Sequence, residues 1–187
     1  MRGGDTTLDE VDLIHRVAAR DGAAFETLYR GYCPRLRRFI VRITRRPQIV
    51  DEIVNDTMLV VWRKASSYNL ASNVSTWIFG IAWRRALKAL ERIDSPVEFD
   101  PDDCPAASAG PEELLIEEEK RATIARALGA LSHEHRAVLE LCYFEGRSCA
   151  EIAGIMRCPV NTVKTRMFHA RRRLRVLMAG MPAVRVA

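Results

Sequence analysis

Apolar residues recur at intervals of three and four along most of the chain, and no segment alternates apolar and polar residues as a strand would. This spacing predicts an all-α fold. It predicts about four helices in the N-terminal half and four more in the C-terminal half. The predicted helices cover residues 7–22, 23–44, 47–65, 74–92, 112–131, 133–146, 149–156 and 161–177.

Capping patterns mark three of the predicted helix starts. Thr7 is followed three residues later by Glu10, and Ser148 is followed by Glu151. In such a capping box the hydroxyl accepts a backbone N–H of the first turn, and the carboxylate accepts the N–H of the cap residue. Ser132 also precedes a helical pattern and can cap it. Helices are therefore expected to begin at these three positions.

A segment rich in proline and acidic residues separates the two helical halves. Residues 95–113 contain four prolines and show no helical or strand period. Residues 94–119 carry ten acidic and no basic side chains, whereas residues 1–93 have a net charge of +6 and residues 120–187 of +9. The sequence thus predicts two small helical domains, at 8–93 and 112–178, joined by a flexible acidic linker at 94–111.

The last predicted helix concentrates positive charge. Its sequence from residue 161 is NTVKTRMFHARRRLR, and its apolar stripe comprises Val163, Met167, Ala170, Leu174 and Leu177. The opposite face carries Thr162, Lys164, Thr165, Arg166, Phe168, His169, Arg171, Arg172, Arg173 and Arg175. A short helix, a three-residue turn and a longer basic helix form a helix-turn-helix, whose second helix enters the DNA major groove. This pattern predicts DNA binding.

Two other interpretations of the basic face are weaker. A solvated charged face mixes both signs, but no acidic residue follows Glu151 in this chain. A helix at a membrane surface needs an apolar face that no folded partner covers, whereas here a matching helix pair precedes it. The longest apolar runs fall well short of the roughly 20 residues of a membrane span, so no membrane insertion is expected.

The remaining composition favours a cytosolic protein without a metal or cofactor. The first ten residues are acidic and lack the apolar core of a signal peptide. The five cysteines include no CxxC pair, so a disulfide framework is not expected. A zinc site from three cysteines and a histidine is an alternative, although the spacings match no common ligand pattern. Its ligands would be Cys142, Cys149, Cys158 and either His133 or His135.

Four segments of the chain, in order, resemble one family. They are AFETLYRGYCPRLRRFIVRIT, VDEIVNDTMLVVWRKA, STWIFGIAWRRALKALER and LSHEHRAVLELCYFEGRSCAEIAGIMRCPVNTVKTRMFHARRRLR. They resemble the small bacterial alternative sigma factors of the extracytoplasmic-function type, in the sigma-70 family. The resemblance implies a four-helix region 2 domain and a helix-turn-helix region 4 domain. It also implies a protein that is not an enzyme, but binds core RNA polymerase, directs it to promoters and helps to open the −10 element.

The resemblance assigns roles to three groups of residues. The polymerase-binding ridge, which would dock on the clamp helices of the large subunit, comprises Asp51, Glu52, Asn55, Asp56 and Leu59. The −10 residues, a polar loop for an unstacked base and cations for phosphates, are Asn69, Ser72, Asn73, Arg84, Arg85 and Lys88. The −35 residues are Thr162, Lys164, Thr165, Arg166, Phe168, His169, Arg171 and Arg172. His169 stands where the family usually has arginine.

The physical chemistry of these groups is consistent with the roles. A polar loop can bind a base edge, and an aromatic side chain can stack on a base. Trp77 is expected in the core, whereas Trp83 has no clear preference between the core and DNA. Thr165 and Phe168 can contact thymine methyl groups, and Lys164 can donate to guanine acceptors.

Other functions remain open at this stage. A stand-alone helix-turn-helix regulator would bind DNA without polymerase, and an adaptor would use its basic helix to bind an acidic protein. The cluster at residues 132–135, SHEH, resembles an acid–base site, but its place at a helix start favours capping. The resemblance also implies an anti-sigma factor as an inhibitory partner.

Overall fold

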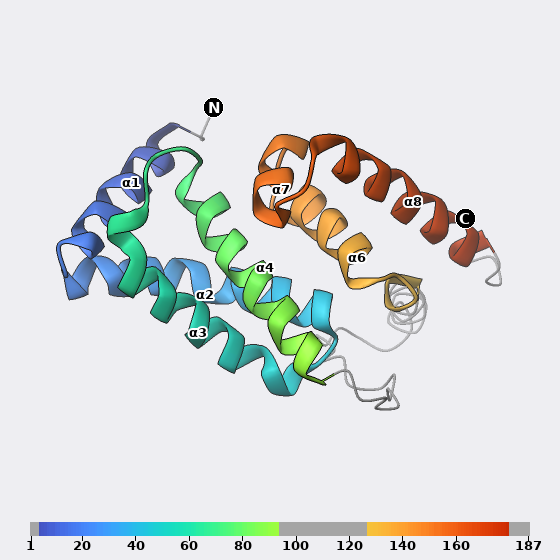
Figure 1. Cartoon of the computed structure of the whole chain (residues 1–187), viewed down its shortest axis with the longest axis horizontal. Helices are drawn as coiled ribbons and strands as arrows, with labels where there is room; N and C mark the ends of the chain where they lie inside the picture. The colour runs from blue at the N-terminus through green and yellow to red at the C-terminus, as the bar shows by residue number, and fades with distance from the viewer. Residues whose placement is uncertain (1–3, 94–126, 180–187) are drawn as a thin grey trace, which may run out of the picture.

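The computed structural model describes residues 4–93 and 127–179, and within these ranges every regular element is helical (Figure 1). The N-terminal domain contains α1 (Gly4–Ala18), α2 (Gly22–Thr44), η1 (Pro47–Ile49), α3 (Val50–Lys64), η2 (Ala65–Ser67) and α4 (Val74–Ile93). The C-terminal domain contains α6 (His133–Leu139), the π-helical segment η3 (Glu140–Phe144), α7 (Cys149–Met156) and α8 (Val160–Ala179). The predicted linker and most of the predicted helix 112–131 lie outside the described residues.

The N-terminal domain follows the predicted periodicity closely, with one error at its first helix. α1 begins at Gly4, so the predicted start at Thr7 is wrong. Asp21 caps α2, although it was not among the predicted caps. Its carboxylate accepts the backbone N–H groups of Ala23 at 2.9 Å and Ala24 at 3.1 Å. A side-chain cap of this kind satisfies donors that have no partner inside the helix.

The C-terminal domain confirms the other two predicted caps. The Ser132 hydroxyl accepts the backbone N–H of His135, and Ser148 and Glu151 form the complete capping box. The predicted helix 133–146 instead changes to a π-helix at Glu140 and ends before Gly146, whose φ is +63°. A single π-turn often occurs at a functional site, and here the segment lies at the contact between the domains.

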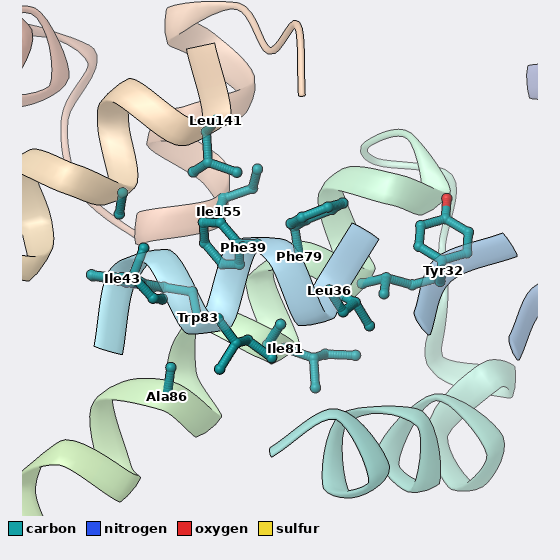
Figure 2. Packing of buried hydrophobic residues seen from close by; sticks show 14 of the residues in the cluster. Tyr32, Leu36, Phe39, Ile43, Phe79, Ile81, Trp83, Ala86, Leu141 and Ile155 are labelled. Atoms are coloured by element: carbon teal, nitrogen blue, oxygen red, sulfur yellow. The ribbon is translucent and has the colours of Figure 1, made fainter. Parts of the chain in front are cut away.

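The two domains pack against each other around one continuous apolar core. α4 packs against α7, and α2 packs against α6 and η3. Figure 2 shows Phe39 and Phe79 of the N-terminal domain beside Leu141 and Ile155 of the C-terminal domain. A Cβ on Gly80 would lie 3.7 Å from both the Cα and the carbonyl oxygen of Ile155, so α4 and α7 approach closely. We call this packing the closed arrangement.

Two ion pairs cross the domain contact. The guanidinium of Arg35 lies 2.6 Å from the carboxylate of Glu145, and that of Arg42 lies 2.9 Å from that of Glu140. The two glutamate side chains are only 8% and 7% exposed. Burial raises the pKa of Glu140, although Arg42 opposes the shift. Arg42 also stacks on the ring of Phe144. Because both carboxylates are buried, each depends on its arginine.

Candidate nucleic-acid interface

The basic face of α8 is presented to solvent because most of its predicted apolar stripe is buried, with Leu174 and Leu177 half-buried. Val163, Met167 and Ala170 lie in the core against α6 and α7, with at most 5% of each exposed. Among the predicted −35 residues, the exposed ones are Lys164, Thr165, Phe168, His169, Arg171 and Arg172. Thr162 and Arg166 are half-buried. The structure thus places the whole predicted group on one helix, with most of it accessible.

Individual contacts along α8 arrange this face. The Thr165 hydroxyl donates to the carbonyl of Asn161 at 2.9 Å, which fixes its rotamer. Phe168 is 61% exposed and meets His169 edge to face, which leaves a large apolar surface among the cations. Arg171 lies over the ring of Tyr143, 5.5 Å from its centre. An exposed aromatic ring beside cations suits contact with thymine methyl groups and phosphates.

A pocket of about 490 Å³ lies where α8 passes the start of α6. Its lining includes His135, His169 and Arg172. Burial lowers the pKa of His135, and His169 and Arg166 lower it further, although Glu134 opposes them. The lowered pKa favours the neutral form of His135 at pH 7, and Arg172 supplies positive charge to the same pocket.

The predicted −10 loop is held in shape by its own polar groups. The Tyr68 hydroxyl donates to the carbonyl of Ser72 at 2.6 Å, and the Asn69 side chain accepts the backbone N–H of Ala71 at 3.2 Å. Ser72 and Asn73 are exposed, and Asn73 donates to the Glu151 carboxylate at 3.3 Å. In the closed arrangement, one predicted base-binding residue is therefore bonded to the C-terminal domain.

Glu151 links the two domains at this loop. Its carboxylate completes the capping box with Ser148, pairs with Arg147 at 3.2 Å and also accepts from Thr76 at 3.4 Å. Burial raises the pKa of Glu151, but the hydrogen bonds from Ser148 and Arg147 outweigh it and bring the pKa to about 2. Glu151 is therefore ionised at any physiological pH and remains an acceptor for Asn73.

The predicted −10 cations line a second pocket, of about 420 Å³, between α3 and α4. Arg84, Arg85 and Lys88 all contribute to it, and Arg157, from the turn between α7 and α8, completes it. Sequence reasoning missed Arg157 because nothing in the sequence indicates that its turn reaches α4. Trp83, which the sequence left undecided, is 3% exposed and contacts His133 across the domain contact. Trp77 is half-buried against Tyr68.

The predicted polymerase-binding ridge lies along the outer face of α3. Asp51, Glu52, Asn55 and Leu59 are exposed, and Asp56 is half-buried. α2 contributes two neighbours that sequence reasoning did not include. Arg37 lies 2.9 Å from Asp51, and the hydroxyl of Tyr29 donates to Asn55 at 3.1 Å. The ridge is thus a mixed surface of two helices, with Leu59 42% exposed at one end.

The described residues provide neither a metal site nor a membrane span. Within residues 4–93 and 127–179, no group of three or more His, Cys, Asp or Glu side chains is placed to hold a metal ion. The zinc site considered from the sequence is not assembled. Within the same ranges, no helix has the length and hydropathy that crossing a membrane requires.

Comparison with known proteins matches both domains. The Sigma-70 region 2 model matches residues 28–95, and the Sigma-70, region 4 model matches residues 121–174. The chain is 29% identical over 164 residues to the ECF RNA polymerase sigma factor RpoE of Cereibacter sphaeroides. This alignment covers 86% of the chain and 89% of the relative.

Two solved structures share the fold. One is the sigma factor RpoE in complex with the anti-sigma factor NepR from Bartonella quintana; it has a TM-score of 0.68 and 23% identity, over 84% of this chain and 98% of that one. The other is CnrH in complex with the cytosolic domain of CnrY; it has a TM-score of 0.69 and 22% identity, over 93% of this chain and 99% of that one.

Proposed function

We infer the function of this chain from the family to which it belongs, the extracytoplasmic-function sigma factors of the sigma-70 group: it directs core RNA polymerase to promoters. The observation that carries this function is the match to regions 2 and 4, in chain order, on the two helical domains. The exposed basic face of α8 supports it, because recognition helices of helix-turn-helix proteins present such a face. The protein itself performs no covalent chemistry and acts in the cytoplasm.

Transcription in a purified system tests this function. With a library of promoters, core polymerase and this chain together are expected to yield transcripts that core polymerase alone and the chain alone do not. A gel shift with and without core polymerase separates a sigma factor, which needs core for tight promoter binding, from a stand-alone regulator, which does not. If the protein fails to associate with core and starts no transcript, the proposed function is wrong.

The −35 element is read, in this proposal, by the exposed residues in the first turns of α8. Replacing both Lys164 and Thr165 by alanine is expected to reduce the discrimination between base pairs at the contacted −35 positions by roughly tenfold. The reason is that each lost base contact costs about 1–3 kcal/mol. Transcription from a library of −35 variants measures the change.

A phosphate-contacting residue on the same helix provides the matched control. Replacing Arg172 by alanine is expected to weaken binding about equally for all sequences and to reduce the salt slope by about 1. If the Lys164 and Thr165 variant also weakened all −35 sequences equally, the assignment of base reading to these two residues would be wrong.

The other two groups have distinct roles in the proposal. The loop residues Asn69, Ser72 and Asn73 bind an unstacked base of the −10 element, while Arg84, Arg85 and Lys88 hold its phosphates. The ridge on α3 binds the clamp helices of the large polymerase subunit. Its exposed carboxylates and Leu59 suit a partner surface with cations around an apolar contact.

An anti-sigma factor is the proposed inhibitory partner. The complexes of RpoE with NepR and of CnrH with the cytosolic domain of CnrY support such a partner for this chain. Inhibition would follow from covering the ridge on α3 or the basic faces, because these surfaces bind polymerase and promoter DNA.

A further inference from the structure

The pocket between α3 and α4 gathers five cations from two domains. Lys64, Arg84, Arg85 and Lys88 come from the N-terminal domain, and Arg157 comes from the C-terminal domain. Among the described residues that line this pocket, none is acidic. Like charges repel one another, so a cluster of cations is favourable when an anion lies among them.

Arg84 is a half-buried member of this group of cations. Burial lowers its pKa, and the charge of Arg157 lowers it further. Its guanidinium folds back over Gly80, where a Cβ would lie 3.4 Å from Nη1. Arg85, by contrast, has Asp56 at 3.7 Å. Arg84 is partly desolvated, and its charged neighbour is another guanidinium. An anion therefore interacts with it more strongly than with a guanidinium in water.

We propose that this pocket binds a phosphate-bearing anion and that the bound anion stabilises the closed arrangement of the two domains. Phosphate fits the cation set because arginine binds it in a bidentate manner and lysine as a point charge. Trp77 lines the same pocket and offers an apolar ring beside the cations. The phosphate can belong to a free polyphosphate or nucleotide, or to the backbone of DNA.

The coupling to domain closure follows from Arg157. The site is complete only when the turn after α7 lies against α4, so an anion that contacts both domains binds the closed arrangement more tightly. A compact chain with as many residues as the described ranges is roughly 40 Å across, from the usual scaling of size with length. Promoter elements at −10 and −35 lie about 25 base pairs, or roughly 85 Å, apart at 3.4 Å per base pair.

The closed arrangement therefore cannot contact both promoter elements at once. An anion that stabilises it would disfavour promoter recognition, and would also occupy the cations proposed to hold the −10 phosphates. This consequence rests on the proposed function, whereas binding of the anion does not.

Calorimetric titration of the purified full chain with inorganic tripolyphosphate, at about 50 mM salt where phosphate contacts are strong, tests the site. Replacing Arg157 by asparagine, which tolerates the positive φ of this position, is expected to weaken binding at least about tenfold. Arg20→Asn is the matched control: it removes one charge at another positive-φ position outside the pocket and should change the affinity less than about twofold.

Hydrogen exchange tests the coupling to closure. With tripolyphosphate at about 100 times its Kd, amides of η3 and α7 that exchange through domain opening should exchange up to about 100-fold more slowly. Absence of binding, unchanged affinity in Arg157→Asn, or an equal loss in Arg20→Asn would overturn the site. Unchanged exchange in the presence of bound anion would overturn the coupling.

A short DNA duplex of random sequence distinguishes the two sources of phosphate. If its binding also needs Arg157 and slows exchange, the DNA backbone is a ligand of the closed arrangement. If its binding is independent of Arg157, the ligand is a free anion. Because tripolyphosphate binding is measured without polymerase or promoter, its failure leaves the proposed function intact, and a failure to initiate transcription leaves the pocket intact.

Discussion

Replacing Arg42 by methionine is expected to weaken the contact between the two domains by about 3 kcal/mol. The substitution leaves the carboxylate of Glu140, 7% exposed, without the guanidinium that lies 2.9 Å away. It also removes the cation over the ring of Phe144. Denaturant unfolding measures the loss of stability, and small-angle X-ray scattering should show a larger radius of gyration as the closed arrangement opens.

A second substitution and a control distinguish a buried-charge effect from a general loss of packing. Arg42→Met combined with Glu140→Gln should recover much of the stability, because an amide is cheaper to bury than an unpaired carboxylate. Arg30→Met, which removes an exposed pair with Glu26 on the same helix, should cost no more than about 0.5 kcal/mol. If Arg42→Met were as mild as Arg30→Met, the ion pair would have no part in holding the domains together.

Reversing the charge at Asp51 and Asp56 to lysine is expected to reduce the affinity for core RNA polymerase at least about 100-fold. Both carboxylates lie on the ridge proposed to bind the clamp helices. Lysines in their place would face cations of the partner surface, and such like-charge contacts cost several kcal/mol. Their ion pairs with Arg37 and Arg85 are solvent-accessible, so the fold should lose little stability. Co-purification with core polymerase and surface plasmon resonance measure the loss.

The matched control for the ridge is an acidic residue elsewhere on the N-terminal domain. Asp12→Lys reverses an exposed charge on α1 and is expected to bind core polymerase as the unmodified chain does. Circular dichroism checks that both variants remain helical. Unchanged binding by the Asp51 and Asp56 variant would refute the ridge as the docking surface.

Much of the local structure follows from short-range patterns. The capping box at Ser148 and Glu151 was predictable because both partners lie within one turn of the same helix. The stripe of Val163, Met167 and Ala170 was predictable because a helix repeats every 3.6 residues. The start of α1 was mispredicted at Thr7, because a capping pattern can also occur inside a helix.

The candidate sites divide in the same way. Exposure of the basic face of α8 follows from its own periodicity, so sequence alone identified the group around Lys164 and Phe168. The pocket at Arg84 and the bond from Asn73 to Glu151 could not be predicted, because each joins residues from different domains. Trp83 could not be placed for the same reason, because one of its contacts, His133, belongs to the other domain.

The sequence by itself determined most of the described helices, which of their faces is apolar and where positive charge accumulates, because these properties depend on residues a few positions apart. Only the tertiary structure decided that the two domains share one core, that η3 adopts a π-helix at their contact and that Arg157 meets Arg84. These features depend on residues far apart in the sequence: Arg35 and Glu145, for example, are 110 positions apart. A periodic pattern carries no information about which apolar face packs against which.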